Sequence, residues 1–144
     1  MVRWRWENIL HKEGDPMIGK LSDNVLLAIL ETIPVEFSVL DANDKVLAWN
    51  KHETRIFKRP EAVLGRDVRQ CHPPKSLDKV LRIIEEMKAG KRDKARFWID
   101  LHGKKVMIEY YALRDKNGTY LGCLEASQDI TELQKLEGEK RLLD

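Results

Sequence analysis

The clearest hydrophobic pattern in the chain lies in residues 76–89. Its apolar side chains recur at helical spacing, at Leu77, Val80, Leu81, Ile84 and Met87. Positions spaced in this way share one face of a helix. Ser76 begins the segment as a helix-capping residue after two prolines, and Gly90 stands where a left-handed C-cap belongs. The pattern therefore predicts a long amphipathic helix whose apolar face is buried against another element.

A second helical pattern precedes Pro34. Its apolar positions are Val25, Leu26, Ala28, Ile29 and Ile33. Ser22 or Asp23 is expected to cap the helix, because a short side-chain oxygen accepts a backbone N–H of the first turn. Pro34 ends the element, since proline lacks the donor and disfavours helix in the residue before it.

Strand patterns flank the long helix on both sides. Residues 36–41 alternate between apolar and polar side chains, and the turn-rich run "DAND" joins them to residues 45–50, which predicts a hairpin. Two short helices are expected next, in residues 51–57 and 58–68, the second closed by Gly65. Three strands follow the long helix, in residues 94–101, 104–114 and 120–128. The run "DKNG" between the last two is the strongest hairpin signal in the chain.

The strand in residues 104–114 has two partly apolar faces. One carries Val106, Ile108, Tyr110 and Ala112, and the other carries Met107, Glu109, Tyr111 and Leu113. One face must cover the helical side, and we expect the other to meet a second chain or the terminal helix. Glu109 and Glu125 are interpreted as solvated side chains, with a role in lining a polar pocket as the alternative.

Helical periodicity returns in the tail, residues 129–144. Leu133, Leu136, Lys140 and Leu143 occupy alternating a and d positions of a heptad. The element order predicts an α+β fold: a five-stranded antiparallel sheet with helices on one face, flanked by N- and C-terminal helices. The expected domains are an extension or linker at 1–20, the folded domain at 21–128 and a signalling helix at 129–144.

Charge and composition narrow the class of protein. Lys and Arg number 26 against 24 Asp and Glu, a net charge of +2, which argues against a nucleic-acid binder. No block of like charge indicates a polybasic membrane tail, and no apolar run approaches the ~20 residues of a membrane helix. The start is too polar for a signal peptide, and the two cysteines lie far apart. We therefore expect a cytoplasmic protein with free thiols.

Two short motifs carry a resemblance to a known family. The run "GRDV" before the long helix and the triplet "DIT" at residues 129–131, in this element order, resemble a PAS domain. The run "CHPPKS" at residues 71–76 is similar to the PAS domain that follows a hemerythrin-like domain in a group of prokaryotic proteins. The resemblance covers about residues 21–144. Four histidines in 144 residues are too few for a di-iron helical bundle, so di-iron chemistry does not transfer.

The PAS resemblance implies a sensor or regulatory module. Such a module is expected to bind a small molecule between its sheet and its helices, to form a homodimer and to signal through its ends to an unknown output protein. The alternative is a ligand-free interaction module that only dimerises. His72 is the residue expected to touch a ligand. The walls of the pocket are expected to include Ile56, Phe57, Val68, Ile84, Phe97, Met107 and Cys123.

The adjacent pair Cys71 and His72 invites several interpretations. Neighbouring side chains on an extended segment point to opposite sides, which disfavours a catalytic pair. Two donors fall short of the four that structural zinc requires. His72 as an iron ligand of haem remains open, although the long helix itself contains no histidine. The favoured interpretation is structural: the prolines and Ser76 start the helix, Cys71 packs as a small apolar group, and His72 bonds locally.

Two further chemistries are disfavoured. Light-sensing PAS domains resemble "GRNCRFLQ" at this place, with a reactive cysteine fourth, whereas Val68 stands fourth in "GRDVRQCH", so a flavin adduct is not expected. No complete acid–base or nucleophile set can be assembled, and we therefore do not expect an enzyme.

Overall fold

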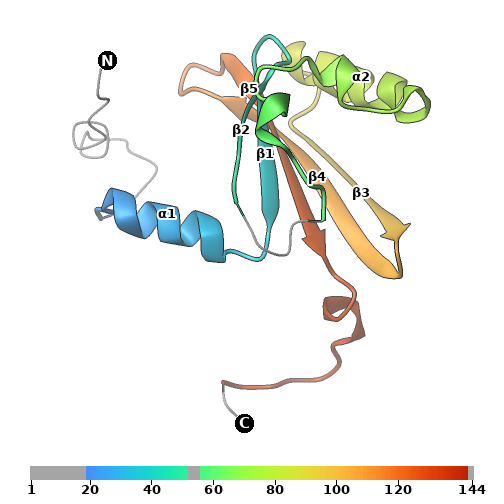
Figure 1. Ribbon diagram of the computed structural model, residues 1–144. Coiled ribbons are helices and arrows are strands. Elements are labelled where there is room, and N and C mark those ends of the chain that lie inside the picture. The colour runs from blue at the N-terminus through green and yellow to red at the C-terminus, as the bar shows by residue number, and fades with distance from the viewer. Residues whose placement is uncertain (1–18, 52–55, 143–144) are drawn as a thin grey trace. The chain divides into compact units, whose positions relative to one another are not determined.

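The computed structural model describes residues 19–51 and 56–142 (Figure 1). The chain divides into two compact units, Met1–Ile33 and Pro34–Asp144. In the first unit, helix α1 spans Asp23–Thr32, and the hydroxyl of Ser22 caps it by accepting from the backbone N–H of Val25 at 3.3 Å. Both the cap and the end before Pro34 are as predicted. No residue of α1 is buried.

The second unit is built on a five-stranded antiparallel sheet. Its strands are β1 (Glu36–Asp41), β2 (Val46–Trp49), β3 (Lys94–Leu101), β4 (Lys104–Arg114) and β5 (Tyr120–Asp129). They lie in the order β2-β1-β5-β4-β3, so the first and last strands of the chain pair in the middle of the sheet. A side chain at Gly122 on β5 would collide with the carbonyl of Leu40 on β1, so only glycine permits this close approach. The predicted α+β class with a five-stranded antiparallel sheet is confirmed.

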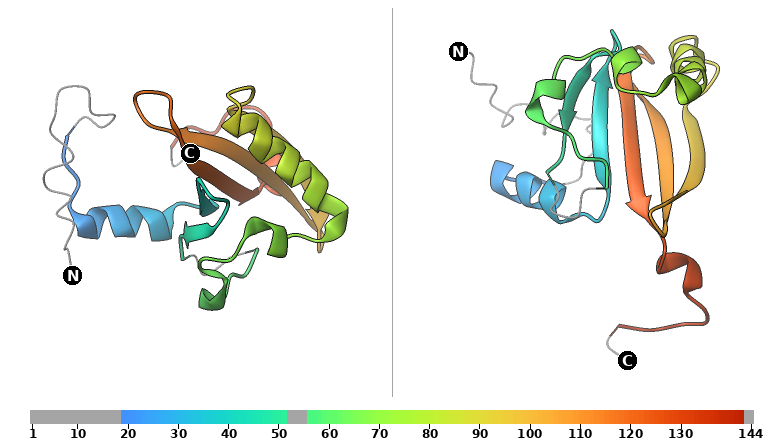
Figure 2. Two further views of the ribbon diagram at one scale, coloured as in Figure 1. Left: turned by 90° about the horizontal axis from the view of Figure 1, so that it is seen from above. Right: turned by 45° about the vertical axis from the view of Figure 1, so that its right-hand side comes forward.

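Helix α2 spans Pro74–Lys88 and lies on one side of the sheet (Figures 1 and 2). It starts two residues before the predicted Ser76, because proline is tolerated in the first turn, where its missing N–H has no helical partner. Pro73 is the N-cap, and the Ser76 hydroxyl instead donates to the Pro73 carbonyl at 3.3 Å. Gly90 adopts φ 71° at the C-terminal end, as predicted.

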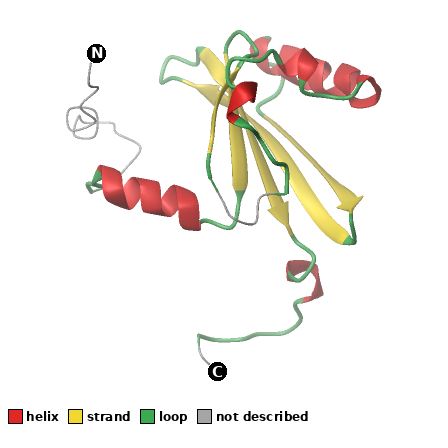
Figure 3. Cartoon of the chain, viewed as in Figure 1, coloured by secondary structure: helices red, strands yellow, loops and turns green. Residues whose placement is uncertain are grey.

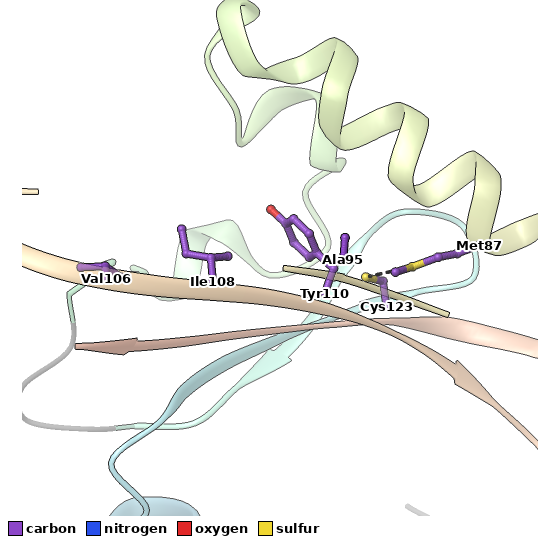
Figure 4. Close-up of a cluster of buried hydrophobic side chains, with 6 residues drawn as sticks. All are labelled: Met87, Ala95, Val106, Ile108, Tyr110 and Cys123. Carbon is purple, nitrogen blue, oxygen red and sulfur yellow. Dashed lines mark hydrogen bonds between the residues drawn. The ribbon is translucent and has the colours of Figure 1, made fainter. Parts of the chain in front are cut away.

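The core forms where the apolar face of α2 meets the sheet. Val80, Ile84 and Met87 are its buried residues, whereas Leu77 and Leu81 are only half-buried. Figure 4 shows the main cluster, with the Cys123 sulfur 3.9 Å from that of Met87. The cluster consists of Met87, Ala95, Val106, Ile108, Tyr110 and Cys123. The face of β4 that carries Val106, Ile108 and Tyr110 is therefore the helical face.

Two single-turn 3-10 helices connect β2 to α2. They are η2 (Glu61–Val63) and η3 (Val68–Gln70), and Gly65 between them has φ 76°. The predicted helix in residues 51–57 falls mostly outside the described residues. The β1–β2 turn is tied to α2 by an ion pair between Asp44 and Lys88 at 2.8 Å. This side of the unit is thereby held to the C-terminal end of α2.

The predicted tail helix is absent from the part of residues 129–144 that the structure describes. After β5 the described residues make one 3-10 turn, η4 (Leu133–Lys135), followed by loop (Figure 3). Leu133 and Leu136 are 50% and 75% exposed, so neither side chain packs into a core formed by the described residues. Gly138 also takes φ 64°, outside helical geometry. A short helix without packing is marginal in water, and the heptad pattern alone was not sufficient.

The triplet at residues 129–131 has a structural role at the end of β5, where the chain leaves the sheet. The Thr131 hydroxyl accepts from the backbone N–H of Lys105 at 2.9 Å, and the backbone N–H of Ile130 donates to the Lys105 carbonyl at 2.8 Å. Asp129 accepts from the Thr131 N–H at 3.0 Å. These bonds fix the direction in which the chain leaves the sheet. The predicted N-terminal extension, residues 1–20, lies almost entirely outside the described residues.

Candidate ligand-binding site

An open pocket of about 760 Å³ lies between the helical face of the sheet and the start of α2. This volume is typical of small-molecule sites. Its walls are mainly apolar, with Ile56 and Phe57 from the β2–α2 connection, Val80 from α2, and Phe97 and Ile108 from the sheet. A second cavity of about 20 Å³, room for roughly one water, adjoins this pocket, shares several of its lining residues and is also lined by Cys123; we call it the constriction. The pocket therefore reaches the centre of the sheet.

A row of polar side chains crosses the floor of this pocket. Strand register places Ser38 on β1 opposite Glu125 on β5, and Glu125 opposite Tyr110 on β4. Side chains opposite one another on adjacent strands share a face. Ser38 and Tyr110 are 7% and 6% exposed, so the row lies under the surface of the pocket. Figure 4 shows the Tyr110 ring standing out from the sheet on this face.

Arg59 completes the row from the opposite wall. Its Nε donates to the Ser38 hydroxyl at 3.0 Å, and its Nη2 lies 3.6 Å from Oε1 of Glu125. The side chains of Arg59 and Glu125 are 17% and 18% exposed. The pair is thus mostly withdrawn from water. Opposite charges attract each other more strongly in such an environment than at the solvent-exposed surface. A cation and an anion both face the pocket.

The surroundings of the polar row raise the pKa of two side chains, Tyr110 in the row and Cys123 beside it. Burial, followed by the negative charge of Glu125, raises the pKa of the Tyr110 hydroxyl. The same two causes, burial first, raise the pKa of the Cys123 thiol to about 12. Both groups are therefore protonated at neutral pH. Cys123 therefore acts as a packing residue, because only the thiolate is a good nucleophile and Cys123 stays in its thiol form.

Glu36 fixes the wall that carries Arg59. Its carboxylate, on β1, accepts the backbone N–H groups of Ile56 and Phe57, the second at 3.1 Å. Glu36 is only 6% exposed, and its neighbour in register is the buried Ser127. A buried carboxylate that binds two amides holds the connection against the sheet. It thereby sets the position of Ile56, Phe57 and, two residues later, Arg59.

Cys71 and His72 both line the pocket and its inner constriction. The expectation that they point to opposite sides is wrong, because the segment is not extended: Cys71 closes η3 with helical dihedrals, φ −99° and ψ −7°. His72 Nδ1 lies 3.1 Å from the Val68 carbonyl, so Nδ1 carries the proton and donates. The lone pair of the neutral ring is then on Nε2. The Cys71 sulfur lies 3.5 Å from the Asp67 carbonyl.

Most of the predicted wall residues are brought together. Ile56, Phe57, His72 and Phe97 line the pocket, and Val68, Ile84 and Cys123 line its constriction. Met107 does neither. It pairs in register with Trp98 and Gln128 and points to the opposite face from Val106 and Ile108, because side chains alternate along a strand. The prediction for Met107 was wrong.

Sequence reasoning missed the polar half of the site. Arg59 lies in a short connection with no periodicity, and Ser38 appeared only as the polar member of an alternating strand. Glu125 was interpreted as solvated, with the pocket as the alternative, and it lines the pocket. A signal was present: polar Ser38 and Glu125 occupy strand positions in phase with apolar core residues, Leu40 and Cys123.

Neither metal-ligand clusters nor membrane spans were found in the described part of the chain. Residues 19–51 and 56–142 hold no group of three or more His, Cys, Asp or Glu side chains placed to bind a metal ion. Within the same residues, no helix is both long and apolar enough to cross a membrane.

Comparison with known proteins was made on both sequence and fold. A family model described as a PAS domain matches residues 26–131. The crystal structure of a C-terminal domain from Streptococcus mutans is 36% identical, with a TM-score of 0.73, over 81% of this chain and 91% of that one. No curated protein matches the sequence.

More distant structures share the fold. A PAS domain from Colwellia psychrerythraea is 19% identical with a TM-score of 0.56, over 73% of this chain and 93% of that one. The PAS domain of BvgS from Bordetella pertussis is 22% identical with a TM-score of 0.51, over 76% and 86%. At this identity the likeness concerns the arrangement of sheet and helices.

Proposed function

This chain belongs to the PAS domain family, and we propose that it is a sensory or regulatory module that binds a small molecule in the pocket between sheet and α2. The observation that supports the proposal is the combination of a pocket of about 760 Å³ with a polar row on its floor. In a core filled only by its own side chains, a largely buried charge pair at this place would not be expected. Removing Arg59 and Glu125 from water costs free energy that an apolar pair would not.

The test is whether ligand occupies this pocket. Native mass spectrometry of the purified chain, followed by a thermal-shift screen of small molecules, should detect a bound species. Ile99 lines the pocket yet is 36% exposed, so Ile99→Trp can fill the space without displacing the core. Asp100→Trp, one residue later on the opposite face of β3, is the matched control. Binding that survives Ile99→Trp as well as Asp100→Trp places the ligand elsewhere, and no binding at all favours a ligand-free interaction module.

Haem is one cofactor whose requirements His72 meets in part. The bond from Nδ1 to the Val68 carbonyl leaves Nε2 as the ring nitrogen with a lone pair, which is the arrangement that iron-ligating histidines use. Bound haem would supply redox or gas-binding chemistry, and His72 would hold its iron. Reconstitution with haem should give a Soret band that His72→Ala abolishes or shifts. A chain that takes up no haem, with or without His72, removes this option.

We further propose that the chain is a homodimer. The face of the sheet away from α2 carries half-buried apolar side chains in register, Val39 beside Leu124 and Leu124 beside Tyr111, and Trp98 on it is 64% exposed. Helix α1 also exposes apolar side chains, with Leu27 at 58% and Val25 at 47%. Contiguous exposed apolar surface is typical of interaction sites. A second copy of the chain would bury these surfaces and give the signal a route to an output protein.

A further inference from the structure

We infer that the pocket selects an uncharged ligand with an apolar body and an amide-like polar edge, in which one acceptor lies beside one donor. This inference rests on the proposed function, because it names the chemistry of the ligand for the same pocket. Arg59 would donate to the acceptor of the ligand, and Glu125 would accept from its donor. Lactams, carboxamides and heterocycles with an adjacent C=O and N–H all present such an edge.

The spacing of the charge pair supports this recognition. Nη2 of Arg59 lies 3.6 Å from Oε1 of Glu125, beyond the range of a good hydrogen bond. The two groups neutralise each other while each retains hydrogen-bonding capacity. Guanidinium has five N–H donors, of which Nε is used on Ser38, and the Glu125 carboxylate has lone pairs beyond the one that accepts from the Tyr110 hydroxyl. Polar groups withdrawn from water gain by completing their bonds. A ligand that bridges the pair completes both at once.

Charge argues against the other ligand classes. A carboxylate bound to Arg59 would stand beside the carboxylate of Glu125, and like charges in a shared, partly buried site disfavour ionisation. An ammonium bound to Glu125 would face Arg59 in the same way. Lys58 and Lys104 also line the pocket, but both are exposed, and water and salt screen their charge. The net charge at the floor of the pocket is therefore zero, which suits a neutral polar edge.

The remaining walls define the body of the ligand. Phe57, Phe97, Ile99 and Ile108 are apolar and come from both sides of the pocket. The Phe97 and Tyr110 rings lie 5.6 Å apart with a tilt of 44°, so the aromatic surface runs directly into the polar row. A flat apolar body would pack on this surface and deliver its polar edge to Arg59 and Glu125.

Three probes of equal size test the inference on the whole chain. They are 2-naphthamide, 2-naphthoate and 2-naphthylmethylammonium, each titrated at pH 7 and followed by the NMR shifts of the backbone amides of pocket residues. We expect 2-naphthamide to bind at least about tenfold more tightly than either charged probe. A naphthoate or an ammonium that binds as tightly as the amide overturns the inference while the proposed function stands. If none of the probes binds, the inference falls, and the proposed function is decided separately by native mass spectrometry and the thermal-shift screen.

A charge substitution gives an independent readout. Glu125→Gln removes the anion but keeps the size of the side chain, so naphthoate should gain affinity and the amide should lose it, narrowing the preference by about tenfold. Glu109→Gln makes the same charge change on the opposite face of β4 and should leave the order of the probes unchanged. If the ratios of the three probe affinities in Glu125→Gln are the same as in the unaltered chain, the inference is overturned. Should that variant fail to fold, the comparison of the three probes on the unaltered chain decides alone.

Discussion

Glu36→Ala should loosen the wall of the pocket formed by the β2–α2 connection, because it removes the acceptor of two backbone hydrogen bonds. The Glu36 carboxylate accepts the backbone N–H groups of Ile56 and Phe57, and at 6% exposure the residue is shielded from solvent. A hydrogen bond to a charged group contributes about 1.5–3 kcal/mol. Two such bonds at the lower end give a loss of about 3 kcal/mol in the free energy of unfolding. Glu36→Gln retains one amide oxygen as acceptor and should lose about half as much.

Two measurements separate local from global effects. Urea unfolding at pH 7 gives the global loss, and hydrogen exchange of the Ile56 and Phe57 amides reports opening of the connection itself. Glu61→Ala, an exposed glutamate in η2 of the same connection, is the matched control and should change neither. The affinity of pocket ligands should fall in Glu36→Ala, because Arg59 is carried by the loosened segment.

The reasoning is refuted by a specific result. If Glu36→Ala unfolds within about 0.5 kcal/mol of Glu61→Ala, and the two amides exchange as slowly as before, Glu36 does not hold the connection. The position of Arg59 would then have to depend on its own contacts with Ser38 and Glu125.

Three further predictions concern stability and assembly. Ile84→Ala should lower the free energy of unfolding by about 2–5 kcal/mol, because Ile84 is 2% exposed. Leu81 is half-buried, so Leu81→Ala should lower it less. Equal losses in urea melts would show that the buried face of α2 has been assigned incorrectly. The hydrogen bond from Lys94, followed by those from Tyr111 and Arg96, lowers the pKa of Glu109 from 4.5 to about 2. Because the folded-state pKa is lower than the unfolded one, this stabilisation is present above pH 4.5 and is lost as the pH falls toward 2. Glu109→Gln should therefore make the free energy of unfolding depend less on pH across that window. A pH dependence identical to that of the unaltered chain contradicts the prediction. In sedimentation at tens of micromolar, the intact chain should run as a dimer. A chain ending at Glu132, which keeps Thr131 but loses the exposed Leu133 and Leu136, should need a higher concentration to dimerise, because a partner could no longer cover those two side chains. Monomers in both cases would rule out the dimer.

Local chemistry determined most of the elements. The Ser22 cap, the Pro34 stop, the turn at residues 115–118 and the left-handed Gly90 each act within a few residues, so the sequence alone located them. The period of the apolar positions located α2 and the five strands for the same reason. The start of α2 differed by two residues because proline is accepted in a first helical turn as readily as serine is accepted as a cap.

Which face of a strand is buried is a tertiary decision. Both faces of β4 are partly apolar, so composition could not choose between Met107 and its neighbours Val106 and Ile108. The packing of α2 against the sheet chose the second set. The tail shows the converse: its heptad pattern was real, but a leucine stripe forms a helix only if something covers it, and the described residues offer nothing there.

The pocket itself depends on residues that only the fold brings together. Ser38, Glu125 and Tyr110 are neighbours because β1, β5 and β4 lie side by side in the middle of the sheet, an order that no single segment encodes. Arg59 meets them because Glu36 ties down the connection before it. The sequence by itself determined a PAS-like sheet, a covering helix and most of the apolar walls. The tertiary structure decided where charge faces the pocket, because strand order, rather than distance along the chain, sets which polar groups share a dry environment.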